Sequence, residues 1–256
     1  MPRVSIKSER EIKLMRVSCR IVSDVLRLLG SAIAPGVTTG GLDRIAEEFI
    51  RSQGGDPAFK GYGNDRRNLF PAAICASIDN QVVHGIPDGR VLREGEIISL
   101  DVGVKKDGYY GDGAWTFAVG DISEQKRHLL HVTEEALYEG IRQARAGNRV
   151  RDISAAVQKY VEARGFSVVK ELVGHGVGKF LHEEPAVPNF VQAGNSGSMT
   201  LRPGMTLAIE PMVNVGTDRV KVHTDGWTVL TEDGKPSAHF EHTILITEDE
   251  PEILTK

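Results

Sequence analysis

The chain has 256 residues, 40% of them hydrophobic and 26% charged, which is the composition of a globular protein large enough to bury a core without disulfide bonds. Its 31 basic and 35 acidic residues leave a net charge of −4, so neither nucleic acid nor an anionic membrane is expected as the main partner. With two cysteines, no apolar run near the roughly 18 residues of a membrane-spanning helix and no leader pattern, the sequence predicts a cytoplasmic protein.

Two amphipathic helices are predicted near the start of the chain. The motif Ser8-x-x-Glu11 is a capping box, in which two side chains satisfy backbone amides of a first helical turn. Apolar or small residues then recur every three or four positions until Gly30, which is expected to end the helix. A second apolar face covers residues 42–50, and this helix is expected to end at Gly54-Gly55.

The rest of the chain alternates strands with two more helices. These helices are expected over about 124–145 and from about 153 to Gly165. Polar stretches at Gly61–Arg67 and Asn189–Ser198 indicate surface loops. Apolar runs predict strands at about 72–84, 96–104, 109–119, 168–174, 205–214, 227–231 and 238–247.

The two parts of the chain resemble each other at fixed offsets. Gly36 and Gly147 each precede a helix, at an offset of 111 residues. Leu92-Arg93-x-Gly95 and Leu201-Arg202-x-Gly204 each precede an apolar strand and an acidic residue, at an offset of 109. An internal repeat would place two similar halves across a shared cleft, whereas the alternative is a chance likeness of common helix and strand endings. The predicted halves are about 8–120 and 121–250, within one catalytic domain of residues 1–256.

Four acidic residues stand in apolar or glycine-rich surroundings, where a lone charge is costly to bury. A carboxylate buried without a partner raises its pKa and takes up a proton. If the four cluster, a strong positive charge must lie among them, and two divalent cations are the simplest source. The four are Asp101, Asp112, Glu210 and Glu241.

The register of one predicted hairpin brings two of these acids together. Asp107-Gly108 is a strong signal for a two-residue turn. With that turn Asp101 lies opposite Ala114, and Asp112 is on the same face as Ala114. The backbones of Asp101 and Asp112 are then diagonal neighbours, about 7–8 Å apart. A slip by one residue would point the two carboxylates apart, and the alternative is a pair of solvated strand aspartates.

Three histidines are candidates for chemistry. His175 lies between glycines, which let the backbone approach another group closely, and imidazole is a good ligand for transition metals. His84 and His182 stand in comparable runs, and each of the three, taken singly, also fits a structural role. The other histidines follow ordinary helix and strand patterns and are expected to be structural, with His242 on the face opposite Glu241. They are His128, His131, His223, His239 and His242.

Six motifs follow one another along nearly the whole chain, from about residue 8 to 255. They are Val83-His84-Gly85-Ile86-Pro87, Asp101 with Asp112 beyond a glycine turn, Gly174-His175-Gly176-Val177-Gly178, Leu181-His182-Glu183-Glu184-Pro185, Ile209-Glu210-Pro211-Met212 and Phe240-Glu241-His242-Thr243. Together they resemble the type I methionine aminopeptidases of the bacterial type, which belong to the M24 metallopeptidases. The resemblance implies the α+β "pita-bread" fold, with two pseudo-symmetric halves, an antiparallel sheet and outer helices.

The same resemblance implies a dinuclear metal site. Asp101 would bind one divalent ion, His175 and Glu210 the other, and Asp112 and Glu241 both. The metals of such a site are Co²⁺, Mn²⁺, Fe²⁺ or Zn²⁺, and the sequence does not choose among them. A hydroxide between the two ions would attack the first peptide carbonyl and release the N-terminal methionine when the second residue is small.

The resemblance also assigns substrate contacts. His84 and His182 would contact the substrate around the scissile bond, and Glu241, or alternatively Glu210, would move the proton. Two departures affect the pocket rim: the stretch 63–69 is longer than usual, and Phe59 stands where a small or thiol residue is common. Cys75 is expected to be a small buried hydrophobe rather than a nucleophile. The implied walls of the methionine slot are Phe59, Tyr62, Cys75, Leu181 and Trp227.

Two features favour the bacterial-type group within the family. His175 and Glu210 are 35 residues apart, too close for the helical insert of type II enzymes, and no zinc-finger extension is present. The implied partners are the N-termini of nascent polypeptides at the ribosome, with no direct nucleic-acid site, no membrane contact and a monomeric state. The alternatives are a related Xaa-Pro peptidase and a metal-free binding protein of the same fold.

Overall fold

The computed structural model describes residues 4–191 and 199–256. Within these residues the predicted helices are confirmed, and none is long and apolar enough to cross a membrane. The capping box of Ser8 and Glu11 is present at the start of the first helix. Gly30 does not end that helix; it lets the ring of Phe117 pack against the backbone, because an added Cβ would lie 2.6 Å from the ring. The helices are α1 (Glu9–Ala32), α2 (Thr39–Ser52), α3 (Glu124–Gln143) and α4 (Val150–Glu162).

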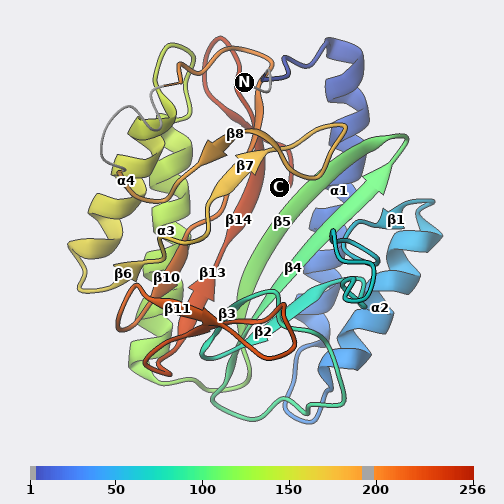
Figure 1. Cartoon of the computed structure of the whole chain (residues 1–256), viewed down its shortest axis with the longest axis vertical. Helices are drawn as coiled ribbons and strands as arrows, with labels where there is room; N and C mark the ends of the chain where they lie inside the picture. Colours follow the sequence, from blue (N-terminus) through green and yellow to red (C-terminus); the bar gives the residue numbers. More distant parts are fainter. Residues whose placement is uncertain (1–3, 192–198) are drawn as a thin grey trace.

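A large antiparallel sheet runs through both halves of the molecule (Figure 1). Along its main path the strand order is β1-β4-β5-β14-β9-β7-β8, and β2 and β15 pair with β4 and β14. Its strands are β1 (Asp56–Pro57), β2 (Cys75–Ile78), β4 (Ile97–Lys106), β5 (Tyr109–Ala118), β7 (Gly174–Gly176), β8 (Glu183–Val187), β9 (Thr206–Ile209), β14 (Glu241–Leu245) and β15 (Glu252–Ile253).

Two three-stranded sheets flank the large one. The first has the order β13-β10-β6 and the second the order β11-β12-β3. Strands β1, β8, β11 and β15 were not predicted, because they are short and have no long apolar run. The strands of the small sheets are β3 (Gln81–Val83), β6 (Ser167–Val168), β10 (Met212–Asn214), β11 (Val220–Val222), β12 (Val229–Thr231) and β13 (Ser237–His239).

Several strands predicted as continuous are broken, and two of the breaks lie at acidic residues of interest. The run 205–214 divides at Glu210-Pro211 into β9 and β10, and the run 238–247 divides at Phe240 into β13 and β14. In both cases the chain passes between the large sheet and a small one. The run 72–84 turns back after Ile78, and 168–174 pairs only at its two ends.

The helices cover one side of the sheet, one pair in each half. Helix α1 packs against β4 and β5, and Figure 1 shows these strands crossing in front of α1. Helix α3 contacts β5, β9 and β14 of the large sheet and also β10 and β13 of the first small sheet. Each half has its own large apolar cluster between helices and strands. Trp115 contributes to both clusters, so the two halves share one continuous interior.

The same hydrogen bonds recur in the two halves. Gly36 N donates to Leu92 O at 2.9 Å, and Gly147 N donates to Leu201 O at 3.0 Å. Both glycines have a positive φ, 96° and 89°. These contacts match the offsets found in the sequence. The boundaries of the halves, and the single domain of 1–256, stay predictions.

Candidate active site

The β4–β5 hairpin has the predicted register. Asp107 and Gly108 form the turn with φ values of 50° and 83°, as a type I′ turn requires. Ten residue pairs follow it without a shift, and Asp101 lies opposite Ala114. Asp101 and Asp112 therefore share one face of the hairpin. Both line a single cavity.

The seam between β5 and β14 adds a third carboxylate. Glu241 lies opposite Ala114 on the other side from Asp101, so the three residues form one row across three strands. Thr243 holds the neighbouring backbone, because its hydroxyl donates to Asp112 O at 2.8 Å and accepts from Asp112 N at 3.2 Å. The backbone positions of Asp112 and Glu241 are thereby fixed relative to each other.

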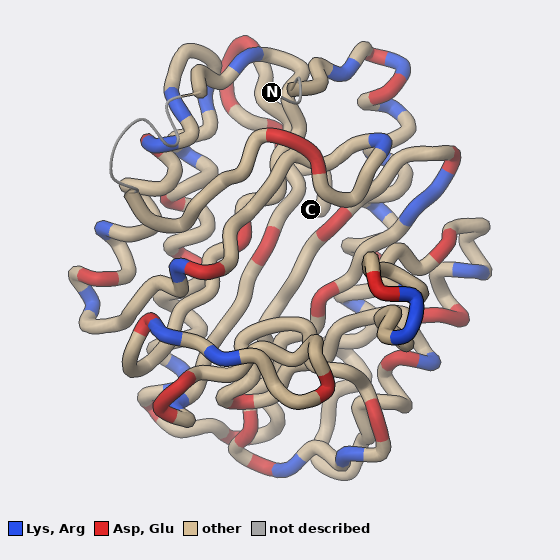
Figure 2. Tube along the Cα trace, in the orientation of Figure 1, with Lys and Arg blue, Asp and Glu red and all other residues tan. Residues whose placement is uncertain are grey.

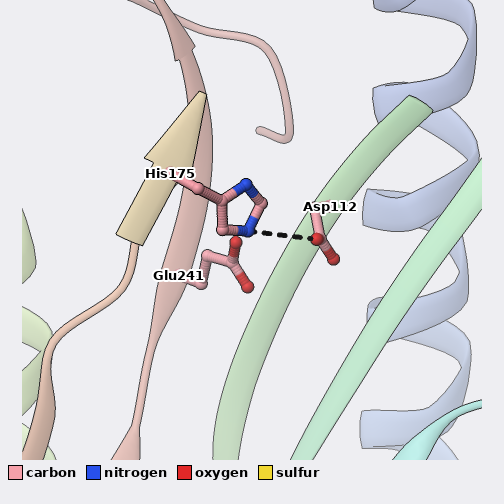
Figure 3. A group of neighbouring side chains, drawn as sticks. All are labelled: Asp112, His175 and Glu241. Carbon is pink, nitrogen blue, oxygen red and sulfur yellow. Dashed lines mark ion pairs between the residues drawn. The ribbon is translucent and has the colours of Figure 1, made fainter. Parts of the chain in front are cut away.

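His175 points from β7 into this cluster (Figure 3). Its Nδ1 lies 2.8 Å from Gly176 O, so this nitrogen carries the proton and Nε2 keeps its lone pair. Nε2 lies 3.8 Å from Asp112 Oδ2 and 3.6 Å from Glu210 Oε1. Burial lowers the pKa of His175 to about 3, so the ring is a neutral ligand. Ligand atoms of Asp112, His175 and Glu241 all lie within 4.8 Å of one another.

The carboxylates lack the positive charge that their burial demands. Burial, and then their mutual repulsion, raises the pKa of Asp112 and Glu241 well above the ordinary range. Burial also raises the pKa of Asp101 to about 7 and that of Glu210 to about 8. In the described part of the chain no Lys or Arg forms an ion pair with any of the four. Figure 2 shows acidic segments on the central strands, while most basic segments lie at the periphery.

The donor set fits divalent cations. Three carboxylate oxygens, one each from Asp101, Asp112 and Glu241, are buried without a hydrogen-bond partner among the described residues. Four carboxylates and one neutral imidazole suit transition-metal ions, which take oxygen and nitrogen ligands together. Two such ions would balance the four negative charges.

The cluster forms the floor of a cavity with apolar walls, of about 120 Å³. Every residue that the sequence analysis assigned to the metals, to the substrate or to the methionine slot lines this cavity. Phe70 also lines it and was missed; its ring meets Phe59 and Trp227 edge-on, with centroids 6.5 Å and 5.3 Å apart. The sequence signal that could have identified Phe70 is its position as an aromatic residue at the end of a polar loop. The lining residues are Phe59, Tyr62, Phe70, Cys75, His84, Asp101, Asp112, His175, Leu181, His182, Glu210, Trp227 and Glu241.

His182 and His84 lie at the cavity as neutral rings. The Nδ1 of His182 lies 2.7 Å from the hydroxyl of Tyr62, and its ring meets that of His175 at 4.2 Å. Burial lowers the pKa of His182 and lowers that of His84 to about 4. His84 has a left-handed backbone with φ of 59°, and the following Gly85 packs directly on Ala76 O. This close approach explains the glycine after His84.

The loop after Tyr62 forms part of the rim. Residues 61–67 are exposed, as predicted. Asn68 connects this loop to the opposite rim. Its backbone carbonyl accepts a hydrogen bond from Trp227 Nε1 at 3.2 Å, and its side-chain Nδ2 donates to Asp225 O at 3.1 Å. In the second predicted loop, residues 192–198 lie outside the described residues. Asn189 is buried rather than exposed, and its amide donates to Glu210 O at 2.9 Å.

The histidines expected to be structural fall into two groups. His128, His131 and His223 are exposed away from the cavity, and His242 contacts Trp115 and Tyr138 on the helix side of the sheet, opposite Glu241 as predicted. The exception is His239, whose Nε2 lies 3.6 Å from Glu210 Oε2. This contact depends on the break between β13 and β14, which no local pattern in the sequence showed.

Comparisons with known proteins agree with this geometry. The model of metallopeptidase family M24 matches residues 13–248. Methionine aminopeptidase 1 of Bacillus subtilis is 52% identical over 250 residues, covering 98% of both chains. The crystal structure of methionine aminopeptidase from Thermotoga maritima matches with a TM-score of 0.94 and 44% identity, covering 99% of this chain and 100% of that one.

The same comparisons bear on the Xaa-Pro alternative. A Xaa-Pro dipeptidase from Bacillus anthracis matches with a TM-score of 0.76 and 24% identity, and the match covers 62% of that chain, so this likeness shows the fold alone. The fold is the pita-bread fold, with two pseudo-symmetric halves around an antiparallel sheet. The fold, the set of metal-ligating side chains and the sequence identity over nearly the full length show that the chain belongs to the M24 metallopeptidases. Within that family it belongs to the methionine aminopeptidases.

Proposed function

We propose that the chain removes the N-terminal methionine from polypeptides whose second residue is small, with two divalent metal ions as cofactors. The observation that carries this proposal is the convergence of four carboxylates and a neutral imidazole at the floor of a small apolar cavity. The curated relatives named methionine aminopeptidase support the substrate.

The five residues would divide between the two ions. Asp101 would hold one ion, His175 and Glu210 the other, and Asp112 and Glu241 would bridge them. This division agrees with the distances, because His175 Nε2 faces Glu210 Oε1 at 3.6 Å while Asp101 lies on the far side of Ala114 from Glu241. When bound, the ions supply Lewis acidity and a nucleophilic water at neutral pH.

The apolar walls select the first side chain. These walls can make dispersion contacts with an unbranched thioether side chain, which needs no hydrogen-bond partner. The wall residues are Phe59, Phe70, Cys75, Leu181 and Trp227. Cys75 has a raised pKa through burial, so it is a packing residue and not a nucleophile. The small cavity would disfavour a first side chain larger than methionine.

Polar groups at the cavity orient the peptide and move protons. His182 is held by the Tyr62 hydroxyl, so its Nε2 is available to the scissile carbonyl or amide. His84 also lines the cavity, as a second neutral ring. Glu241, or alternatively Glu210, would carry the proton from the attacking water to the leaving amine, because both carboxylates lie at the floor of the cavity.

The direct test is peptide hydrolysis by protein first stripped of metal and then given Co²⁺, Mn²⁺, Fe²⁺ or Zn²⁺ singly. We expect release of methionine from a Met-Ala peptide, and no release from Met-Leu or acetyl-Met-Ala peptides. Cleavage of Ala-Pro but not Met-Ala would support the Xaa-Pro reading. Two bound ions without cleavage of any peptide would support a binding protein.

Cellular context follows from the same proposal. Nascent chains at the ribosome are the source of unblocked N-terminal methionine, and the cytoplasm is where they emerge. We infer a monomer, because the described residues form a complete cavity from one chain. Sedimentation at micromolar concentration, with and without metal, tests this state, and metal analysis of protein purified without chelators identifies the ion.

A further inference from the structure

His239 is a buried histidine next to the proposed metal site that none of the proposed roles uses. Its side chain is 2% exposed, and its Nε2 has no hydrogen-bond partner among the described residues. The nearest carboxylate oxygen is Glu210 Oε2, at 3.6 Å. A buried polar nitrogen without a hydrogen-bond partner costs about 1–3 kcal/mol, so its position requires an explanation.

The backbone of His239 is held firmly by the neighbouring strand. His239 N donates to Thr116 Oγ1 at 2.9 Å, and the same hydroxyl donates to His239 O at 2.7 Å. Ser99 Oγ lies 2.8 Å from that hydroxyl, and all these atoms are buried. On its other side His239 pairs with Met212 of β10. The imidazole therefore extends from a rigid point towards Glu210.

Glu210 lies between two imidazoles. Its Oε1 faces His175 and its Oε2 faces His239, each at 3.6 Å from an Nε2 atom. Asn189 Nδ2 donates to the backbone carbonyl of Glu210 at 2.9 Å, so the backbone is held and the freedom that remains lies in the side chain. A carboxylate that binds a metal through one oxygen is usually oriented by a hydrogen bond to the other.

We propose that His239 is a positioning residue, whose Nε2–H donates to Glu210 Oε2 and presents Glu210 Oε1 to the ion beside His175. The proposal rests on the metal site of the proposed function. A move of roughly 0.5 Å brings the two atoms within hydrogen-bond distance, and such bonds are often long before substrate or cofactor binds.

Three substitutions separate this role from simple packing. His239→Gln keeps an N–H at the same number of bonds from Cα as imidazole Nε2, His239→Asn places it one bond short, and His239→Leu removes it. His242→Leu is the matched control, because His242 is also a buried imidazole and lies on the opposite face of the sheet. Each variant is stripped of metal and titrated with Co²⁺ by calorimetry and visible absorption.

We expect His239→Leu and His239→Asn to weaken Co²⁺ binding at one of two sites by about 10- to 100-fold, and to lower kcat for a Met-Ala peptide more than they raise KM. His239→Gln should stay within about threefold of the parent. His242→Leu should lower the melting temperature and leave Co²⁺ affinity within about threefold. The Co²⁺ titration is independent of turnover, so it can fail while methionine release by the parent protein succeeds.

Two results would overturn the proposal. Equal Co²⁺ affinity in the parent, Gln, Asn and Leu proteins would mean that the contact does not position Glu210. Loss of one bound Co²⁺ in the Gln variant would make His239 a ligand instead. If the Leu variant does not fold, the comparison of the Gln and Asn variants still decides. Both carry a side-chain amide at position 239, and they differ in how far that amide reaches towards Glu210.

Discussion

Asp112 is the residue at which the backbone and the proposed metal site depend most directly on each other. Its backbone amide and carbonyl are both bonded to Thr243, while its carboxylate faces His175. One carboxylate oxygen is buried without a partner among the described residues. Changes to this side chain therefore affect the chemistry without removing the bonds that hold its strand.

Asp112→Asn is expected to lower kcat for a Met-Ala peptide by at least about 100-fold, because an amide cannot bridge two cations as a carboxylate does. The metal-free variant should unfold at the same urea concentration or a higher one, since one of several mutually repelling carboxylates is gone. Steady-state kinetics and urea denaturation in chelator measure the two effects.

The control is Asp107→Asn, the same change in the exposed turn of the same hairpin, where asparagine also accepts the left-handed backbone. It should leave kcat within about twofold. Near-normal turnover of the Asp112 variant would exclude a bridging role for this residue.

At the residue scale the sequence predicted the acidic residues that meet in the cavity and missed the residues that contact Glu210. Asp101 and Glu210 end apolar runs, which is a local signal of a buried charge. His239 and Asn189 have no such signal, because each meets Glu210 only through tertiary contacts. The roles of His84 and His182 came from family resemblance, since a histidine near a glycine or a glutamate is not specific by itself.

Turn chemistry decides the arrangement of the β4–β5 hairpin. Both turn residues have positive φ, and the ten pairs that follow set which side chains share a face. A local dipeptide signal therefore predicted a tertiary fact, the common face of Asp101 and Asp112. The ends of strands were harder to predict. Apolar residues flank the breaks in the runs 205–214 and 238–247, and hydrophobic periodicity cannot show that a chain moves from one sheet to another.

Gly108→Ala tests the turn. An added Cβ at Gly108 meets no atom within 4 Å, but φ is 83°, so the cost is conformational and about 1 kcal/mol in the free energy of unfolding. Gly89→Ala is the matched control, because Gly89 is also exposed with open space but without a positive φ. Its free energy of unfolding should change by no more than about 0.5 kcal/mol.

Urea denaturation of the metal-loaded proteins gives both values, and kcat of the Gly108 variant should stay within about twofold because ten pairs hold the register. Equal effects of the two substitutions would contradict the type I′ assignment.

On the scale of the whole molecule, the pKa shifts connect stability to pH and metal. Between about pH 6.5 and 8 the carboxyl groups of the unfolded chain are ionised. The folded metal-free protein still binds protons at Asp101, whose pKa is raised from 3.8 to about 7, and at Glu210, whose pKa is raised from 4.5 to about 8. The native state then binds more protons than the unfolded state, so stability falls as pH rises. The buried histidines oppose this trend near pH 6.5, because their pKa is 6.5 when unfolded and lower when folded, and their contribution fades as pH rises above about 7.5.

We expect the free energy of unfolding in chelator to decrease by roughly 2–4 kcal/mol from pH 6.5 to 8, because the protons lost from all four buried carboxyl groups outweigh the opposing effect of the histidines. With Mn²⁺ present the trend should reverse, because metal ions compete with these protons and bind more tightly as pH rises. Urea denaturation at three pH values, with chelator and with Mn²⁺, measures both trends. A rise in stability with pH in chelator would contradict the carboxylate assignment.

The large sheet passes from one half to the other at β5 and β14, through two residue pairs, Glu241 with Ala114 and His242 with Gly113. Asp112 and Glu241, the proposed bridging ligands, stand on either side of this narrow junction. Bound cations would thus cross-link the two halves as well as serve the reaction. Storage in chelator would then make the junction itself more susceptible to proteolysis, so handling of the purified enzyme affects its architecture as much as its turnover.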